Sequence, residues 1–211
     1  MALTKKSIGF FGGSFNPIHL GHLIAAERAR ETFNLETVYF IPTWSSPHKT
    51  NISLSPPYHR IQMIRLAIED NAHFSILLFD VQRQCPTYTM NTIEDISVQF
   101  PRTQYTYYFI VGSDAIEKLP SWKSPRKILS SLHFLVAKRQ KKPLENTFFD
   151  RIYKEIPEAK EKIHCFPMPY IDISSSVIRD RVSKKKSIQY LVPKTVESYI
   201  DNNTLYKEAF I

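Results

Sequence analysis

The segment that decides the fold is Ile8–Leu23, which reads IGFFGGSFNPIHLGHL. Its apolar start, Ile8–Phe11, is typical of a buried strand, and Leu20–Phe33 is typical of a helix. Between them, Gly12 and Gly13 are expected to break the strand, because glycine reaches backbone conformations that other residues avoid. A strand, a glycine turn and a helix in this order direct backbone N–H groups and the positive end of a helix dipole to one place, which favours phosphate binding.

Two histidines, His19 and His22, are three residues apart at the start of the expected helix. Residues at this spacing share a helix face, so both imidazoles are expected to project into the phosphate site. There they would stabilise negative charge by hydrogen bonding and, when protonated, by their own charge. Half of a zinc site is an alternative, but zinc requires further ligands and only the carboxylate of Glu27 is near in the sequence.

The composition suits one α/β domain that acts on anionic small molecules. Of 211 residues, 43% are apolar and 13% aromatic, which is enough for a core. The formal net charge is +8. The lysines gather partly in short runs, at 138–142 and 184–186, which are typical of solvated surfaces, so we expect nucleotide substrates rather than nucleic acid.

The two cysteines, Cys85 and Cys165, make no disulfide framework, which fits a reducing compartment. Apolar runs stay well short of the roughly 20 residues of a membrane span. The first seven residues lack the apolar core of a signal peptide. We therefore expect a cytoplasmic protein without a membrane partner, and the sequence leaves a homo-oligomer open.

Strand-like and helix-like segments alternate along the chain. After the first helix, strands are expected at 37–41, 74–79, 105–111, 133–137 and 162–166, with helices at 58–70, 89–100, 126–131, 149–156, 174–182 and 193–201. Ser55 and Pro56 predict the cap and first residue of the second helix, and 80–89 is expected to be a loop. The alternation predicts a Rossmann-like, doubly wound α/β fold, a mostly parallel sheet with helices on both faces. We expect a single domain, 1–211, with a small helical part from about residue 174.

Sheets of this kind bind ligands beyond the carboxyl ends of their strands. Four polar or glycine-rich segments are expected there, at 12–16, 44–49, 80–89 and 112–114. One cleft would then collect all four. The spacing of the glycines does not match the GxGxxG fingerprint, so a redox dinucleotide cofactor is not expected.

A second polar segment, Ile173–Arg179, reads ISSSVIR. Ser174 or Ser175 would cap a helix whose first N–H groups have no partner within the helix, and Arg179 lies on the same end. Hydroxyls, amides and a guanidinium would converge there on a polyphosphate. An ordinary capped helix with a surface arginine is the alternative.

The two segments together resemble a known superfamily. GGSFNP followed by HLGH resembles the first signature of the nucleotidyltransferases that carry an HxGH motif, and ISSSVIR resembles their second signature, with Ser176 where threonine is usual. Three further stretches resemble the bacterial nicotinate-nucleotide adenylyltransferase family: SPHK at 46–49, TYT at 87–89 with the NTI that follows at 91–93, and FIVGSD at 109–114 with the later Trp122. The resemblance covers nearly the whole chain.

The resemblance implies transfer of the adenylyl group of ATP to nicotinate mononucleotide, giving deamido-NAD and pyrophosphate in NAD biosynthesis. His19 and His22 would be catalytic. ATP would be bound by Gly12, Gly13, Ser14, Phe15, His22, Gly112, Asp114, Ser175, Ser176 and Arg179. The mononucleotide would be bound by Asn16, Trp44, His48, Lys49, Thr87, Tyr88, Thr89 and Trp122, with the tryptophan stacked on the pyridine ring. Mg²⁺ would be carried by the ATP phosphates, and no metal site made of protein residues is expected.

The sequence also departs from the family pattern. Asn16 and Asn91 stand where aspartate is usual, Gln82 stands where an acid is common, and the segment 137–140 lacks the usual Arg-Pro-Gly ending. Two alternatives stay open: the same chemistry on another acceptor (phosphopantetheine, or an alcohol phosphate with CTP), and a nucleotide-binding regulatory module without turnover. The TYT stretch and Trp122 favour the nicotinate acceptor, and the intact histidine pair favours an enzyme.

Overall fold

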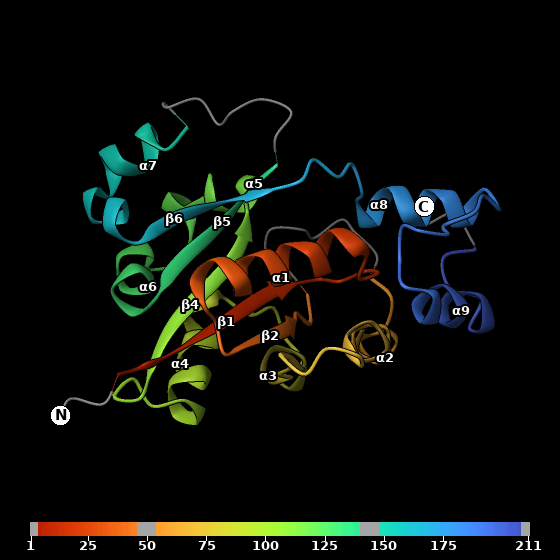
Figure 1. Cartoon of the computed structure of the whole chain (residues 1–211), viewed down its shortest axis with the longest axis horizontal. Coiled ribbons are helices and arrows are strands. Elements are labelled where there is room, and N and C mark those ends of the chain that lie inside the picture. The colour runs from red at the N-terminus through yellow and green to blue at the C-terminus, as the bar shows by residue number, and fades with distance from the viewer. Residues whose placement is uncertain (1–3, 46–53, 140–147, 208–211) are drawn as a thin grey trace.

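The structure of the protein is a computed structural model that describes residues 4–45, 54–139 and 148–207. Within these residues six parallel strands form one sheet in the order β3-β2-β1-β4-β5-β6 (Figure 1). The strands are β1 (Lys6–Gly13), β2 (Thr37–Pro42), β3 (Phe74–Ile76), β4 (Tyr105–Gly112), β5 (His133–Arg139) and β6 (Ile163–Met168). The chain order reverses between β1 and β4, which is the doubly wound arrangement expected from the sequence.

Helices fill most of the connections between the strands. They are α1 (Leu20–Phe33), α2 (Pro57–Ile68), α3 (Phe79–Gln82), α4 (Thr89–Gln99), α5 (Ser113–Ile116), α6 (Pro125–Ser131), α7 (Asp150–Glu155), α8 (Ser175–Ser183) and α9 (Lys194–Asn202), with short 3₁₀ turns η1 (Leu119–Ser121) and η2 (Pro157–Glu161).

The helices cover both faces of the sheet and bury two apolar clusters against it (Figure 1). One cluster joins α1 and α2 to the last helices, through residues such as Ala26, Ile64 and Ile178. The other joins α4 and α6 to the opposite face, through Ile93 and Ile128. The Rossmann-like fold with helices on both faces is therefore confirmed.

The end of β1 differs from the expectation. Gly12 and Gly13 do not break the strand, because both still pair with β2, opposite Ile41 and Pro42. Neither has a positive φ; the left-handed residue of this segment is Phe15, with a φ of 45°. The two glycines instead permit close packing, since a Cβ at Gly12 would lie 3.0 Å from the ring of Phe109.

Two boundaries predicted around the next helix were also wrong. The third strand ends at Ile76, because β3 pairs with only three residues of β2, and 79–82 form the short helix α3 within the expected loop. Helix α2 begins at Pro57 with Pro56 at the capping position, so the side chain of Ser55 caps nothing. The backbone of Ser55 serves the site instead, as described below.

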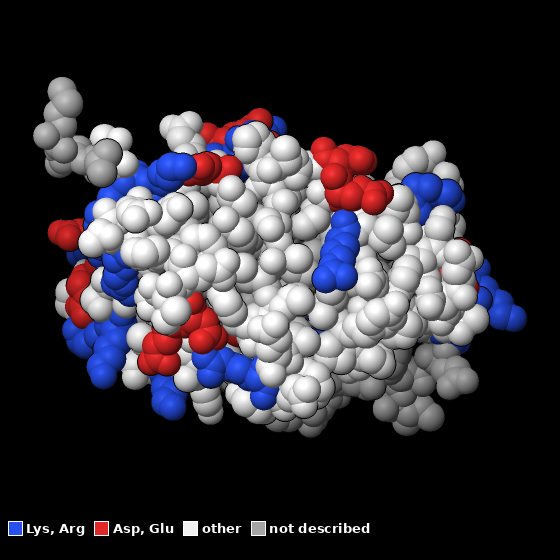
Figure 2. Space-filling view, turned by 90° about the horizontal axis from the view of Figure 1, so that it is seen from below, with Lys and Arg blue, Asp and Glu red and all other residues white. Residues whose placement is uncertain are grey.

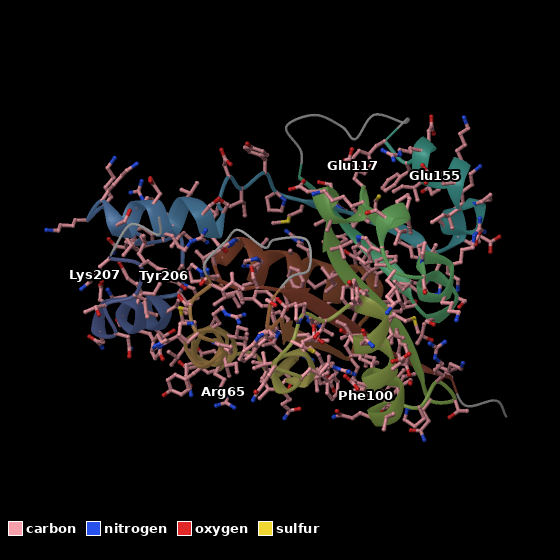
Figure 3. All side chains as sticks on the ribbon, turned by 180° about the vertical axis from the view of Figure 1, so that it is seen from behind. Arg65, Phe100, Glu117, Glu155, Tyr206 and Lys207 are labelled. Carbon is pink, nitrogen blue, oxygen red and sulfur yellow. The ribbon has the colours of Figure 1, made fainter. Side chains whose placement is uncertain are left out.

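The C-terminal segment closes one end of the molecule. Helices α8 and α9 lie beside each other beyond the carboxyl end of β1 (Figure 1), and Tyr206 lies near them (Figure 3). Tyr206 is buried and belongs to the same apolar cluster as α1. Within the described ranges, every helix is too short or too polar to cross a bilayer.

Candidate active site

The turn that follows β1 packs its own side chains inward. Phe15 is 1% exposed, and its ring meets the ring of His22 edge-on with 5.1 Å between centroids. A Cβ added to Gly13 would lie 3.1 Å from this ring. The side chain of Phe15, which was expected to bind ATP, therefore packs against Gly13 and the ring of His22.

The two histidines stand at the start of α1, as predicted. Their rings stack with 3.7 Å between centroids, and His19 occupies the capping position. The backbone N–H of His19 donates to Nδ1 of His22 over 3.3 Å. Because Nδ1 accepts this bond, the neutral ring of His22 carries its proton on Nε2, which makes that atom a donor suited to a phosphate oxygen.

The second polar segment meets the first at this point. The side chain of Ser174 caps α8 by accepting from the N–H of Val177 over 3.3 Å. The hydroxyl of Ser175 donates to the carbonyl oxygen of Pro17 over 2.9 Å. Arg179 is half-buried, and burial lowers the pKa of its guanidinium. The amino end of α8, with Ser174 and Ser176 in hydrogen-bond contact at 3.0 Å, thus lies against the turn after β1.

Asn16, expected to bind the mononucleotide, has a structural role in the turn after β1. Its side chain is fully buried, and Oδ1 accepts from the N–H of Ser55 over 3.1 Å and from the hydroxyl of Tyr206 over 3.0 Å. An oxygen held in this way faces the protein interior. Asn16 therefore ties the turn to α2 and to the C-terminal segment, and its neutral amide makes the same two acceptor bonds that a carboxylate would make.

A fully buried arginine, which sequence reasoning missed, holds the site loops together. Arg60 donates from Nε to the carbonyl oxygen of Ser55 (2.9 Å), from Nη1 to those of Ser14 (2.9 Å) and Thr43 (2.7 Å), and from Nη2 to that of Trp44 (3.2 Å). All four of these acceptors are backbone carbonyl oxygens, and burial lowers the pKa of the Arg60 guanidinium. One signal was present in the sequence, because Arg60 shares the apolar face of α2 with Met63 and Ile64.

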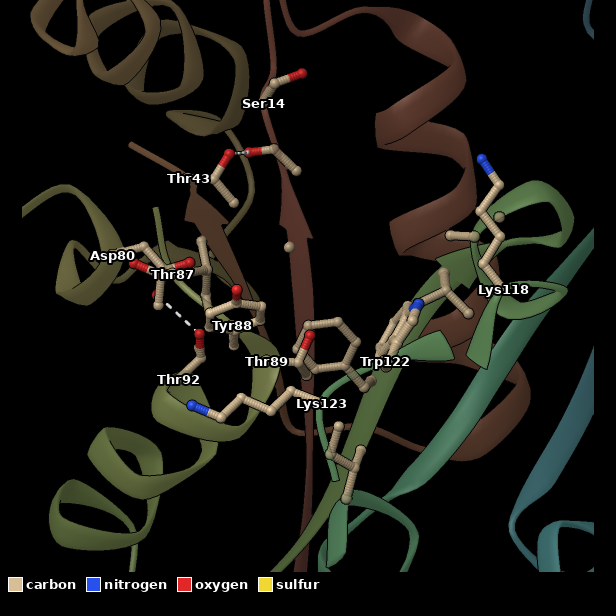
Figure 4. Close-up of a pocket in the computed structure, with 18 of the residues that line it drawn as sticks. Ser14, Thr43, Asp80, Thr87, Tyr88, Thr89, Thr92, Lys118, Trp122 and Lys123 are labelled. Carbon is tan, nitrogen blue, oxygen red and sulfur yellow. Dashed lines mark hydrogen bonds between the residues drawn. The ribbon is translucent and has the colours of Figure 1, made fainter. Parts of the chain in front are cut away.

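The main cavity lies at the carboxyl ends of β1, β2 and β4 and has a volume of about 510 Å³ (Figure 4). Trp122 lines it on one side, and Thr87, Tyr88 and Asp80 line it on the other (Figure 4). Nine of the predicted site residues are among its lining: Gly12, Gly13, Ser14, Thr87, Tyr88, Thr89, Gly112, Asp114 and Trp122. A Cβ at Gly112 would meet nothing within 4 Å, so this glycine borders open space.

Other predicted residues lie outside the lining of this cavity. Trp44 contributes a carbonyl oxygen to Arg60, as described above. His48 and Lys49 fall outside the described residues. The remaining ones belong to the adjoining turn and helix ends: Phe15, Asn16, His19, His22, Ser175, Ser176 and Arg179.

Both positively and negatively charged side chains line the cavity. Lys118 and Lys123 line it, and the ammonium of Lys123 lies 5.0 Å from the ring centre of Tyr88. Asp80 is 4% exposed and accepts a bond from the hydroxyl of Thr92 over 2.8 Å; burial raises the pKa of its carboxyl to about 6. Sequence reasoning missed Lys118 and Lys123, and it placed Asp80 in the expected cleft only as the first residue of the segment 80–89, without a role of its own. Among the described residues no group of three or more His, Cys, Asp and Glu has the arrangement of a metal site.

Comparison with known proteins identifies the family. The cytidylyltransferase-like family matches residues 10–181. Curated relatives include a "Probable nicotinate-nucleotide adenylyltransferase" of Desulfitobacterium hafniense, 39% identical over 96% of both chains, and a "Nicotinate-nucleotide adenylyltransferase" of Bacillus subtilis, 34% identical over 96% of this chain and 99% of the relative. A solved structure of the Plasmodium falciparum nicotinic acid mononucleotide adenylyltransferase, complexed with NaAD, superposes with a TM-score of 0.75 at 24% identity, covering 96% of this chain and 98% of the other.

The fold and the match over residues 10–181 define a cytidylyltransferase-like nucleotidyltransferase. Within that class, the chain belongs to the nicotinate-nucleotide adenylyltransferase family.

Proposed function

We propose that this protein joins ATP to nicotinate mononucleotide, forming deamido-NAD and pyrophosphate in the cytoplasm. The observation that carries the proposal is that two regions of the structure adjoin each other. The region where the starts of α1 and α8 meet the turn after β1, which we assign to phosphate, adjoins the cavity of about 510 Å³ that Trp122 lines. A dinucleotide-forming enzyme needs both. The relatives named for this reaction are similar over almost their whole length.

In the proposed reaction the 5′-phosphate of the mononucleotide attacks the α-phosphorus of ATP. A bond forms between them, the bond from the α-phosphorus to the bridging oxygen breaks, and the electron pair leaves with pyrophosphate. A phosphate dianion is already a nucleophile, so the protein needs no general base. Its residues supply positioning and charge stabilisation, with Nε2–H of His22 and the guanidinium of Arg179 directed at phosphate oxygens.

The acceptor ring is assigned to the side of the cavity that holds Trp122. An indole face suits a flat pyridine ring. Tyr88 is the residue that precedes α4, so the first N–H groups of this helix, beginning at Thr89, are available for the nicotinate carboxylate. The ammonium of Lys123, which lies beside the ring of Tyr88, adds positive charge near this helix start.

Mg²⁺ fits this site as a companion of the triphosphate. Asp114 is an exposed cavity carboxylate, and Asp80 is buried and hydrogen-bonded, so the described donors do not make a cage of their own. A divalent ion on the phosphate oxygens would neutralise their charge and keep most of its waters. Cys85 and Cys165 form no disulfide with each other, which is compatible with a reducing cytoplasm.

Pyrophosphate release with a panel of substrates tests the proposal. ATP with nicotinate mononucleotide is expected to give rapid release, whereas ATP with phosphopantetheine and CTP with an alcohol phosphate are expected to give none. Fast turnover with either alternative would assign the same chemistry to another acceptor. ATP binding without release for every acceptor would favour a regulatory module.

A further inference from the structure

A second depression lies at the opposite end of the sheet from the proposed active site. Tyr105 and His133 begin β4 and β5, and Lys162 precedes β6, so the depression borders the amino ends of three neighbouring strands. Figure 1 shows β1 and β4 beginning near the N-terminus, away from α8. Since β4 has eight residues, the two sites are about 25 Å apart along this strand.

The lining of this depression is strongly cationic. It includes Lys5, Arg102 and Lys162 together with the imidazole of His133, and no carboxylate is among its lining residues. None of the three cations takes part in an ion pair with a carboxylate within the described residues, whereas eight other basic residues do. The guanidinium of Arg102 lies 5.4 Å from the ring centre of Tyr107, which holds it over the depression.

Two partly buried histidines adjoin the ammonium of Lys162. The ammonium of Lys162 is 3.4 Å from Nε2 of His133, and Nδ1 of His133 is 2.9 Å from Nε2 of His164. An ammonium only donates, so Nε2 of His133 accepts and the neutral form of this ring is favoured. Burial and the charge of Lys162 lower the pKa of His133 to about 4 and also lower that of His164.

The size of the depression limits what it can hold. Its volume is about 160 Å³, which corresponds to about five water molecules at roughly 30 Å³ each. This accommodates a compact oxyanion and not a nucleotide. We propose that the cluster of Lys5, Arg102, Lys162 and His133 is a binding site for a small phosphate-class anion, phosphate or pyrophosphate, separate from the site of adenylyl transfer.

The test uses the histidines as local reporters, because the active site is also expected to bind phosphate. The imidazole pKa values of His133 and His164 would be measured by NMR in inorganic phosphate and in chloride at equal ionic strength. An anion beside Lys162 opposes its effect on His133, so phosphate is expected to raise the pKa of His133 by about one unit. Resonances would be assigned by comparison with the His164→Gln protein.

A pair of variants makes the result specific. Arg102→Gln combined with Lys162→Gln is expected to abolish the phosphate-dependent shift. Arg102 is exposed and Lys162 is only partly buried, and neither has a carboxylate partner within the described residues, so the fold should persist. Arg65→Gln removes one exposed positive charge on α2, a helix that contributes no residue to the lining of the depression, and should keep the shift. The proposal would be overturned if the pKa values of His133 and His164 were the same in phosphate as in chloride. It would also be overturned if the phosphate-dependent pKa shift persisted in the double variant.

Discussion

Arg179 donates a hydrogen bond from Nη1 to the backbone carbonyl oxygen of Asn16 over 2.8 Å, joining residues 163 positions apart. This bond holds the amino end of α8 against the turn after β1. It also fixes a guanidinium beside the helix start that carries His19 and His22. Only one of its terminal nitrogens is used in this bond, and the planar group can present the other to a phosphate.

Replacing Arg179 by alanine is expected to raise KM for ATP more than KM for the mononucleotide. The reason is the loss of a planar phosphate donor on the triphosphate side of the site. Steady-state kinetics with each substrate varied would measure both. Arg181→Ala on the same helix, whose side chain bonds to the carbonyl oxygen of Ser187, is the matched control. Unchanged KM for ATP and unchanged kcat in the Arg179→Ala protein would remove this residue from the site.

His22→Ala is expected to lower kcat by about two orders of magnitude or more, the scale of one lost transition-state donor. The fold should survive, because His22 is only partly buried at a helix start. Single-turnover kinetics would separate the chemical step from substrate binding. His73→Ala, an exposed histidine before β3, should behave as wild type. A wild-type rate in the His22→Ala protein would refute its phosphoryl-transfer role.

Arg60→Met is expected to lower the free energy of unfolding by about 3 kcal/mol or more, since four carbonyl acceptors lose charge-assisted bonds in a buried place. Activity should fall as well, because the loops with Ser14 and Trp44 lose their common anchor. Urea unfolding gives the energy directly. The comparison is Arg65→Met on the same helix, which should cost little. Equal stability of the two variants would mean that Arg60 is not the anchor.

Asp80 predicts a pH-dependent difference in stability. Its pKa in the folded protein, about 6, lies above the ordinary 3.8, so the folded state holds this proton more tightly than the unfolded chain. The stabilisation is therefore present below about pH 4 and is lost as the pH rises through 6. Asparagine does not titrate. The free energy of unfolding of the Asp80→Asn protein minus that of wild type should therefore increase by about 2–3 kcal/mol between pH 4 and pH 7. Urea unfolding across this range checks it; a difference that is flat with pH would contradict the buried carboxyl.

Local patterns predicted most of the fold. The apolar periodicity of α1 placed both of its ends correctly, and the alternation of strands and helices predicted the parallel sheet. Because all carboxyl ends of such a sheet meet at one edge, the cavity residues from 12–14, 87–89 and 112–114 were expected together, and the structure brings them together.

The features that the sequence did not predict depend on contacts between residues far apart in the chain. Nothing near Asn16 in the sequence indicates its bond to Tyr206, 190 residues away. Arg60 is a residue type usually found at the surface, and its burial is favourable because two distant loops supply three of its four carbonyl acceptors, on Ser14, Thr43 and Trp44. Gly12 and Gly13 stayed in β1 because pairing with β2 satisfied their backbone, which outweighs the turn preference of glycine.

The most direct test of the proposed function is dinucleotide formation from Mg-ATP with nicotinate mononucleotide and, separately, with nicotinamide mononucleotide. We expect deamido-NAD and pyrophosphate in equal amounts. We also expect kcat/KM to be roughly one to two orders of magnitude higher for nicotinate mononucleotide. The backbone N–H groups at the start of α4 can donate to a carboxylate, whereas the NH₂ of a carboxamide finds no acceptor there and costs about 1–3 kcal/mol when left unpaired. Equal kcat/KM values would contradict the assignment of the ring pocket. Binding of ATP without formation of either dinucleotide would contradict adenylyl transfer itself.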